Sequence, residues 1–396
     1  MSENKLTYLV GGGPICEEPL VPYDERIILF LNDFARELRQ SRQAAEHSDI
    51  MSLAYFCRAA NIRRLKQAYE NSYKRIGRGV VFHITPGNVP VNFAFSFLFG
   101  LLAGNANIVR VPEKEYPHTQ IICDAINRVL EDPAHGDIKK MTAFVHYLID
   151  DEITTRFSAQ CDARIIWGGD RTIAHIRGIP TRPRGVEIAF ADRYSFCVMD
   201  APSVLSASDG DIDKLALGFY NDTYLMDQNA CSSPMLIVWQ GDGKEKAKER
   251  FYAALFECAK QKYTLEPVFA VDKYTQLLEM AIDMPGIKNV KRYENYLYVA
   301  TLSALPEKTS EVLRAKYGLF FELDEDDLGK IAPFIDRKFQ TLTYFGGEKQ
   351  RLQDFVLQNR LVGIDRIVPI GQALDIGVYW DGYDIVSTLS RIVDLK

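Results

Sequence analysis

The chain has 396 residues, of which 47% are hydrophobic and 25% are charged, and its formal net charge is −6. This composition is typical of a globular protein and excludes a disordered chain, a collagen-like chain and a coiled-coil rod. The acidic balance and the lack of a long basic block argue against a nucleic-acid partner, because phosphate backbones need a basic footprint. At about 150 residues per domain, the length predicts two or three domains.

The first half of the chain alternates between strand and helix patterns after a helical start over residues 24–70. Short β-branched runs predict buried strands, and apolar residues at helical spacing predict the helices between them. The expected strands are 80–84, 107–111, 143–149 and 163–167, and the expected helices are 91–102, 117–130, 153–160 and 171–177. This alternation indicates an open, doubly wound parallel sheet over residues 75–200.

The second half repeats the same pattern. The expected strands are 194–199, 233–239, 296–300, 318–321, 341–345 and 365–369, and the expected helices are 212–227, 244–261, 348–359 and one that begins in the acidic stretch 323–334. The fold class is therefore α/β, with two doubly wound parallel-sheet domains. We place the boundaries at residues 1–190, 191–375 and 376–396, and we expect the last segment to pack back on the first domain.

Motifs for metals, disulfides and membranes are missing. The seven cysteines include no C-x-x-C pair and the six histidines no H-E-x-x-H, so neither a disulfide framework nor a metal site is expected. The most apolar stretch, residues 93–103, has about half of the ~20 residues that a membrane span needs. The first residues lack the pattern of a signal peptide. We therefore expect no membrane span and a cytoplasmic location.

The chain also lacks the G-x-G-x-x-G, G-x-x-x-x-G-K and G-x-S-x-G motifs, so a site must be sought in the loops that follow strands. Asn88 lies in the first such loop, residues 85–90, between a predicted strand and an apolar helix. Its amide can donate to a developing oxyanion at the carboxyl ends of the strands. Local sequence alone favours the alternative, a turn residue that caps the next helix.

Cys231 lies in a second loop, DQNACSSP, among small and polar residues. An accessible loop cysteine with polar neighbours can ionise, as a catalytic thiol must. The other six cysteines lie mostly in apolar segments, where free cysteine packs as a small hydrophobe. For Cys231 itself, the local sequence leaves catalysis and a plain loop position equally open.

A third loop, WGGDR, follows the predicted strand 163–167 and precedes a helix. Gly168 and Gly169 there would let a diphosphate approach the helix N-terminus, although glycines serve any tight turn equally well. Arg110 is a candidate phosphate partner.

Together these segments resemble a known family. The stretch GRGVVFHITPGNVPVNFAFSFLFGLLAGNANIVRVPEKEYP resembles the aldehyde dehydrogenase superfamily. DQNACSSPMLIVW and VYWDGYDIVSTLSRI resemble the nucleophile loop and C-terminal segment of its LuxC-type acyl-CoA reductase branch, the reductase component of bioluminescence fatty-acid reductases. The resemblance implies a dinucleotide-binding first domain, a thiol-bearing second domain and an active site in the cleft between them.

The resemblance also implies residue roles. Cys231 matches the catalytic thiol, and Asn88 matches the oxyanion-hole amide that acts with the Cys231 backbone N–H. Arg110 and Glu113 match the residues that hold the adenosine ribose, and the glycines of WGGDR match the turn under the diphosphate. The expected cofactor contacts are Thr85, Pro86, Arg110, Glu113, Gly168, Gly169 and Asp170.

One departure concerns the general base of aldehyde-oxidising relatives. Glu187 is the only nearby candidate, and 231 − 187 = 44 residues is too long a spacing for a clean match. Loss of that base suits thioester reduction, because hydrolysis needs an activated water and reduction does not. His83 is a candidate proton donor, although buried strand histidines are more often hydrogen-bonded core residues. Arg110 favours the 2′-phosphate of NADPH, whereas Glu113 would repel it, so NADH stays open.

The sequence thus predicts NAD(P)H-dependent reduction of an acyl thioester, carried by CoA or by a protein, to an aldehyde through an acyl-cysteine. The alternatives are oxidation of an aldehyde to a free acid and a non-catalytic binding protein of the same fold. An acyl-transferring partner protein is left open. Residues 71–78 stand where relatives have an oligomerising hairpin, which leaves a homodimer and a homotetramer both open.

Overall fold

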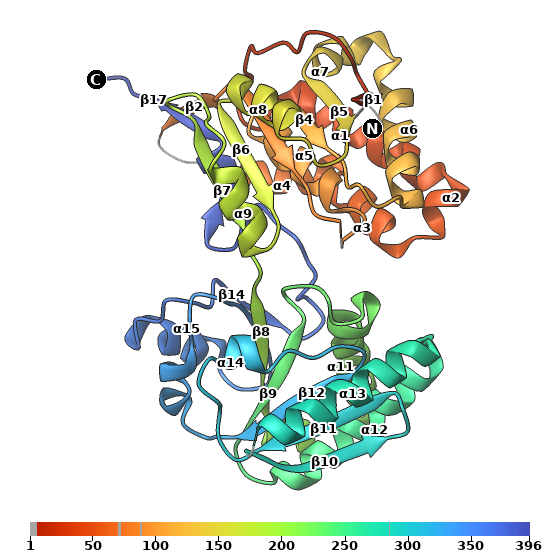
Figure 1. The fold of residues 1–396 in the computed structure, drawn as a ribbon, viewed down its shortest axis with the longest axis vertical. Helices are drawn as coiled ribbons and strands as arrows, with labels where there is room; N and C mark the ends of the chain where they lie inside the picture. Colours follow the sequence, from red (N-terminus) through yellow and green to blue (C-terminus); the bar gives the residue numbers. More distant parts are fainter. Residues whose placement is uncertain (1–5, 70–72, 88, 285) are drawn as a thin grey trace. The chain divides into compact units, whose positions relative to one another are not determined.

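A computed structural model describes residues 6–69, 73–87, 89–284 and 286–396 (Figure 1). The chain divides into two compact units. The first unit contains the residues up to Ala191 together with Val378–Lys396, and the second contains Asp192–Gly377. Within the described ranges, no helix combines the length and the apolar composition that a membrane crossing requires.

The first unit is built on a six-stranded sheet with the order β1-β5-β4-β3-β6-β7. Its strands are β1 (Thr7–Val10), β3 (Val80–Ile84), β4 (Ala106–Arg110), β5 (Thr142–His146), β6 (Ala163–Trp167) and β7 (Val186–Phe190). All neighbours pair in parallel except β1, which is antiparallel to β5. The sequence predicted four of these strands, and their parallel pairing confirms the α/β class.

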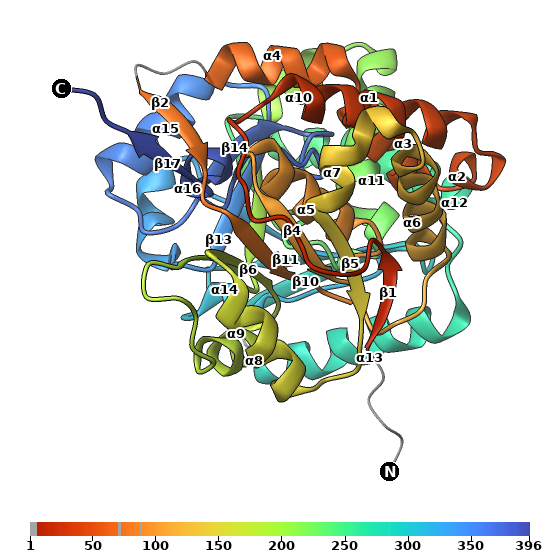
Figure 2. The same ribbon diagram turned by 90° about the horizontal axis from the view of Figure 1, so that it is seen from above.

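Helices cover both faces of this sheet (Figure 2). They are α1 (Glu25–Gln40), α2 (Arg42–Ala45), α3 (Ser48–Phe56), α4 (Ala59–Tyr69), α5 (Asn92–Leu102), α6 (Pro117–Leu130), α7 (Gly136–Lys140), α8 (Asp151–Gln160) and α9 (Asp170–Arg177). In Figure 2, α1, α3 and α6 lie on one side of the sheet and α8 and α9 on the other. The expected helical start over residues 24–70 is confirmed as α1 to α4, with turns between them.

Helix α5 is the centre of the first core. All eleven of its residues are buried, as expected for a helix that is apolar on every side. It lies against β3 and β4. Gly100 makes this close approach possible, because a Cβ there would lie 1.9 Å from the Asn107 Oδ1 atom.

The C-terminal segment completes the first unit. It contains β15 (Tyr379–Trp380), β16 (Tyr383–Asp384), α16 (Ile385–Thr388) and β17 (Ser390–Val393), and β17 pairs antiparallel with β2 (Lys74–Gly77). The Asn105 Nδ2 atom donates to the Leu389 carbonyl at 3.0 Å, and the Arg78 Nε atom donates to the Thr388 carbonyl at 2.8 Å. These contacts tie the chain's end to β2 and to the turn before β4.

The second unit is built on a seven-stranded sheet with the order β10-β11-β12-β9-β8-β13-β14. Its strands are β8 (Tyr194–Asp200), β9 (Pro234–Gln240), β10 (Ile287–Tyr293), β11 (Leu297–Leu302), β12 (Leu319–Asp324), β13 (Phe339–Phe345) and β14 (Arg366–Pro369). Only β10 is antiparallel to its neighbour. The sheet is again the doubly wound type that the sequence predicted.

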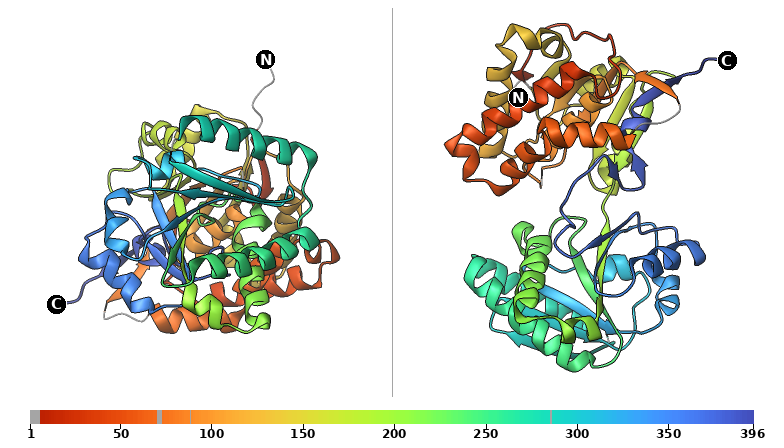
Figure 3. Two further views of the ribbon diagram at one scale, coloured as in Figure 1. Left: turned by 90° about the horizontal axis from the view of Figure 1, so that it is seen from below. Right: turned by 180° about the vertical axis from the view of Figure 1, so that it is seen from behind.

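The helices of the second unit also cover two faces. They are α10 (Ala201–Ser206), α11 (Asp209–Thr223), α12 (Lys244–Lys262), α13 (Pro267–Asp283), α14 (Thr309–Val312) and α15 (Lys349–Gln358). Helices α11 and α12 lie side by side over one hydrophobic core (Figure 3), whereas α13 packs Leu277 into the core of the opposite face.

One predicted element is wrong. The acidic stretch 323–334 does not begin a regular helix but ends β12 and continues as short 3₁₀ turns at Leu328–Lys330 and Ala332–Phe334. The Asp327 carboxylate accepts the Gly329 N–H at 2.9 Å, a local bond that competes with helix hydrogen bonds. Pro333 also lacks the N–H that a longer helix would need.

Candidate active site

Cys231 lies in the loop between α11 and β9, where the sequence placed it. The loop begins with Asp227 and Gln228, whose φ angles of 52° and 57° place two consecutive non-glycine residues in the left-handed region. Such backbone is uncommon and persists only when its surroundings hold it. The rest of the second unit must therefore hold this loop in its left-handed conformation.

The Gln228 side chain supplies one of these restraints. It is 1% exposed, its Oε1 atom accepts the Gly318 N–H at 2.7 Å, and its Nε2 atom donates to the Leu319 carbonyl at 3.1 Å. The amide thereby bonds to the backbone at the start of β12 as a neighbouring strand would. The Tyr263 hydroxyl adds a bond to the Asp227 carboxylate at 2.6 Å.

Two serines hold the other side of the loop. The Ser195 hydroxyl, on β8, donates to the Cys231 carbonyl at 2.7 Å and accepts the Thr341 N–H at 3.2 Å. The Ser233 hydroxyl donates to the Asp222 carbonyl at 2.6 Å. The backbone of Cys231 is thus fixed from strand β8 and, through Ser233, from helix α11.

Asp222 extends this network. Its buried carboxylate accepts the Gly371 N–H at 2.6 Å and the Ala373 N–H at 2.9 Å. Burial raises the pKa of Asp222 to about 7, partly offset by these two backbone donors. The carboxyl group therefore joins α11 to the turn after β14.

The environment of Cys231 differs from that of most other cysteines. Cys231 is partly exposed, whereas Cys57, Cys123, Cys161 and Cys197 are buried, and burial raises the pKa of those four thiols. Cys16 and Cys258 are also partly exposed. Cys258 lies on α12, and burial raises the pKa of its thiol too. Within the second unit, Cys231 is the partly exposed thiol in a loop of polar residues.

The expected cofactor residues lie in the first unit, behind neighbouring parallel strands. Thr85 follows β3, Arg110 ends β4 and Gly168 follows β6, and these strands are adjacent in the order β4-β3-β6. The Thr85 hydroxyl donates to the Arg110 carbonyl at 2.6 Å, which ties two of the loops together. Ligands of open α/β sheets bind at this carboxyl edge.

A hydrogen bond from the residue that precedes α6 fixes the turn after β3. The Tyr116 hydroxyl donates to the Gly87 carbonyl at 2.6 Å, and Pro86 beside it is partly exposed. Asn88, the predicted oxyanion donor, lies outside the described residues, so its role stays a prediction.

Arg110 and Glu113 form an ion pair. The Arg110 guanidinium also lies 4.8 Å from the Tyr147 ring centroid, and its Nη2 atom donates to the Tyr147 carbonyl at 3.3 Å. The Arg110 Nε atom is buried without a hydrogen-bond partner among the described residues. The structure therefore brings the two expected ribose contacts together, with the charge of Arg110 already balanced by Glu113.

The glycine turn after β6 leaves space above the backbone. Gly169 precedes α9, and a Cβ added there would meet no atom within 4 Å, whereas one on Gly168 would lie 3.1 Å from the Thr172 side chain. Asp170, in the first turn of α9, is exposed. An open turn at a helix N-terminus fits a diphosphate.

His83 does not lie at this edge but in the core of the first unit. It is fully buried, with the Nδ1 atom 2.8 Å from the Ser96 hydroxyl and the Nε2 atom 2.9 Å from the Asn107 Oδ1 atom. The Ser96 hydroxyl also accepts the Trp167 indole N–H at 3.0 Å. These partners assign the proton to Nε2, and burial lowers the pKa of His83 to about 4. A neutral imidazole with both nitrogens bonded favours a structural role over proton donation.

Glu187 is also engaged. One carboxylate oxygen accepts the Arg164 guanidinium at 2.6 Å and the other accepts the Arg177 Nε atom at 2.7 Å. Both oxygens thus lie in ion pairs within the first unit, which weakens the hypothesis of a water-activating base.

Sequence reasoning did not identify Gln228 and Ser195 as site residues. A signal existed for Ser195, a polar residue in the predicted buried strand 194–199, and such residues usually hydrogen bond to something specific. Gln228 lies in the polar loop itself, so nothing in the sequence indicates that it is buried. The hydrogen-bond partners of both side chains, however, lie in parts of the chain that are distant in the sequence.

Comparison with known proteins decides the family. The sequence model described as "Acyl-CoA reductase (LuxC)" matches residues 48–276, more than half of the chain. The chain belongs to the LuxC family. Its sequence is 23% identical over 325 residues to the long-chain acyl-protein thioester reductase of Vibrio harveyi, covering 80% of this chain and 63% of that protein. The Photorhabdus laumondii protein of the same name is 23% identical over 76% of this chain and 60% of its own length. This LuxC chain thus spans less than two thirds of these relatives.

Solved structures show the aldehyde dehydrogenase fold. An NAD-dependent benzaldehyde dehydrogenase from Corynebacterium glutamicum has a TM-score of 0.62 at 16% identity, covering 94% of this chain and 84% of that chain. A 1-pyrroline-5-carboxylate dehydrogenase from Thermus with bound NAD has a TM-score of 0.62 at 13% identity, covering 94% and 81%. The predicted family and fold class of this LuxC protein are therefore confirmed.

Proposed function

We propose that this LuxC protein reduces an acyl thioester to an aldehyde with NAD(P)H, through an acyl group bound to Cys231. The observation that carries the proposal is a partly exposed thiol in a left-handed loop fixed by Gln228 and Ser195. The relatives from Vibrio harveyi and Photorhabdus laumondii are named long-chain acyl-protein thioester reductases, which supports the same chemistry here.

In the proposed first step, the Cys231 thiolate attacks the carbonyl carbon of the thioester. The Asn88 amide and the Cys231 backbone N–H donate to the oxyanion, and one such donor is typically worth about 3 kcal/mol. The C–S bond to the donor thiol then breaks, and that thiol leaves with the electron pair and gains a proton from solvent. Cys231 is left as a thioester.

The first unit offers residues that fit a nicotinamide dinucleotide. The open turn at Gly169 suits the diphosphate, and the Arg110–Glu113 pair after β4 suits the ribose, with Thr85, Pro86 and Asp170 around them. When bound, NAD(P)H supplies a hydride equivalent to the acyl carbon. Collapse of the resulting tetrahedral alkoxide would re-form the C=O bond, break the C–S bond and release Cys231 as a thiolate, so the product would be an aldehyde.

We propose NADPH as the preferred reductant, because an arginine at the ribose position can bind a 2′-phosphate. Glu113 opposes this preference, since its carboxylate already pairs with Arg110 and would instead suit the free hydroxyl of NADH. The ratio of kcat/KM for the two cofactors tests the assignment. Glu113→Gln should shift that ratio toward NADPH, and a shift toward NADH would reverse the assignment.

Oxidation to a free acid is the second candidate, and Glu187 would have to serve as its base. The ion pairs of Glu187 with Arg164 and Arg177 favour reduction instead. The acyl donor is proposed to be a thioester of CoA or of a partner protein, and the partner is supported by the "acyl-protein" in the relatives' names. For the oligomeric state, we propose a homodimer or a homotetramer.

Intact-protein mass spectrometry tests the first step. The chain is incubated with a panel of acyl-CoAs without a nicotinamide, and one acyl group per chain should appear on Cys231. Cys258→Ser, which removes the other partly exposed thiol of the second unit, should acylate normally. Cys231→Ser should not form the thioester. Equal acylation of the wild-type chain and Cys231→Ser would refute the proposal.

A further inference from the structure

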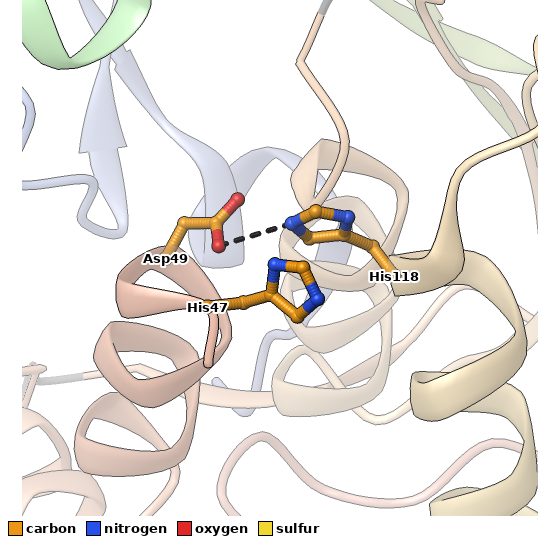
Figure 4. A group of neighbouring side chains, drawn as sticks. All are labelled: His47, Asp49 and His118. Atoms are coloured by element: carbon orange, nitrogen blue, oxygen red, sulfur yellow. Dashed lines mark hydrogen bonds and ion pairs between the residues drawn. The ribbon is translucent and has the colours of Figure 1, made fainter. Parts of the chain in front are cut away.

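A second group of reactive side chains lies in the first unit, away from every residue assigned above. His47 immediately precedes α3, Asp49 lies in its first turn, and His118 lies in the first turn of α6 (Figure 4). The two helices begin beside each other, so residues 71 positions apart in the sequence face a common point.

The geometry suits a metal ion. One ligand atom from each residue lies within 4.8 Å of the other two. The His118 Nε2 atom is 3.2 Å from the Asp49 Oδ1 atom, and the two imidazole centroids are 4.2 Å apart. Ligands bound to tetrahedral zinc at about 2.0–2.1 Å are separated by about 3.3 Å. The His118–Asp49 pair already has this spacing, and the His47 nitrogen, which lies within 4.8 Å of both, would have to move closer when an ion binds.

The His118 side chain is 12% exposed, and its Nε2 atom, which faces Asp49, is the atom that would bind an ion. Its Nδ1 atom is buried with no hydrogen-bond partner in the described part of the chain, as is the Nδ1 atom of His135, so that atom does not distinguish the group. The His47 ring makes ring contact with His118, and no hydrogen bond from its nitrogens is found there. The Asp49 Oδ1 atom, which faces His118, also accepts the Ile50 N–H at 2.9 Å.

Other histidines of the first unit show the contrast. His175 pairs with Asp151 at 2.8 Å and His135 pairs with Asp33 at 3.0 Å. Among the described residues, neither pair has a third ligand side chain at metal-binding distance. Within the residues that the structure describes, the His47, Asp49 and His118 group is the one with two nitrogens and one oxygen, a set that suits zinc and its neighbours rather than magnesium or calcium.

We propose that His47, Asp49 and His118 bind one divalent transition-metal ion, with Zn²⁺ as the best match and water in the remaining position. The ion would join the start of α3 to the start of α6. His118 lies two residues after Tyr116, whose hydroxyl holds the Gly87 carbonyl, so the ion would also brace the segment that supports the turn after β3. The proposal does not rest on the proposed reductase chemistry, because its test measures metal binding and not reduction.

The test uses the full chain, freed of metal by a chelator and titrated with Zn²⁺ alone in a calorimeter. The wild-type chain should bind one ion and show a higher Tm in its presence. His47→Ala should weaken binding at least about tenfold, as loss of a ligand does at other sites. His47 is only partly buried and its ring makes no hydrogen bond among the described residues, so the variant should fold.

Two controls make the result decisive. His175→Ala removes an exposed histidine from a His–Asp pair without a third ligand and should bind Zn²⁺ as the wild type does. X-ray absorption of the loaded chain should show nitrogen and oxygen at about 2.0–2.1 Å and no sulfur at about 2.3 Å. Binding that is equal in His47→Ala, or a sulfur shell from the free thiols, would overturn the proposal, as would no binding at all.

Discussion

Cys231 can act as a nucleophile only if its backbone is held in place. Ser195 bonds the Cys231 carbonyl directly, and Gln228 holds the start of the same loop through Gly318 and Leu319. Replacing Gln228 with alanine would leave the Gly318 N–H and the Leu319 carbonyl without partners, at a cost of about 1–3 kcal/mol. The acylation rate of Cys231 should fall at least about tenfold, since small displacements of reacting groups are costly. Stopped incubation with acyl-CoA followed by mass spectrometry measures this rate.

The control for this prediction is Gln350→Ala, which removes an exposed glutamine from α15 in the same unit. It should leave both the acylation rate and the Tm unchanged. If Gln228→Ala lowers the Tm but acylates at the wild-type rate, the side chain stabilises the unit without positioning the thiol.

Asp222 gives the second unit a pH-dependent stability. Burial raises the pKa of Asp222 to about 7, so the folded state holds the proton more tightly than the unfolded state does. This contribution is complete at low pH and is lost as the pH rises from about 4 to about 7. The advantage of the wild type over Asp222→Asn in free energy of unfolding should therefore shrink across that window, by at most about 4 kcal/mol.

Urea unfolding of both proteins at a series of pH values measures this difference. A stability difference that does not vary with pH would show that Asp222 is ionised throughout and acts only through its bonds to Gly371 and Ala373.

At the residue scale, loop composition is visible locally and made Cys231 a candidate thiol. His83 was a candidate because it precedes Asn88, and Glu187 because aldehyde-oxidising relatives have a general base upstream of the cysteine, yet the roles of both depend on partners elsewhere. His83 is bonded to Ser96 and Asn107, 13 and 24 positions away. The proposed metal group also has no sequence signal, since no motif joins His47 to His118. Local sequence patterns indicate which residue type lies at which position, but they do not indicate which distant side chain will be its hydrogen-bond partner.

At the scale of elements, the contact of α5 with β3 and β4 depends on Gly100. A Cβ at this position would lie 1.9 Å from the Asn107 Oδ1 atom and 2.9 Å from the His83 Nε2 atom. Gly100→Ala should therefore destabilise the first unit by about 3 kcal/mol, because a packed core has no room to move. Thermal denaturation measures the change.

Gly136→Ala is the matched control, since nothing lies within 4 Å of its added Cβ and its φ of −56° is helical. This variant should keep or slightly raise the Tm. Equal Tm values for both variants would show that α5 tolerates a shift from β4.

The elements that sequence patterns predicted are those with a one-sided or fully apolar pattern, such as β3 and α5. Helix α13 was missed because its apolar residues do not lie on one face, so Leu277 is buried while others are exposed. Val271 and Ile282 are exposed at 63% and 81%, whereas Lys273 is buried and donates to the Tyr317 carbonyl at 2.7 Å. Hydrophobic periodicity predicts a helix face only when the apolar side is the buried one.

At the scale of the molecule, the chain returns to its first unit after building the second. The Arg75 Nε atom donates to the Ser390 hydroxyl at 2.9 Å, between residues 315 positions apart. A pairing over this separation leaves no local signal. The alternation of strands and helices predicted two doubly wound units, and the resemblance to a known family supplied the expected roles of their residues. Family resemblance and local pattern thus supplied different parts of the prediction.

The central claim is that the acyl group on Cys231 is reduced rather than hydrolysed, and a single turnover tests it most directly. The acylated chain is separated from free acyl-CoA, NADPH is added, and aldehyde, free acid and remaining adduct are measured. The account predicts one aldehyde for each adduct, with the protein mass returning to that of the unmodified chain. Release of free acid instead of aldehyde, or an adduct that persists with NADPH and with NADH, would contradict it.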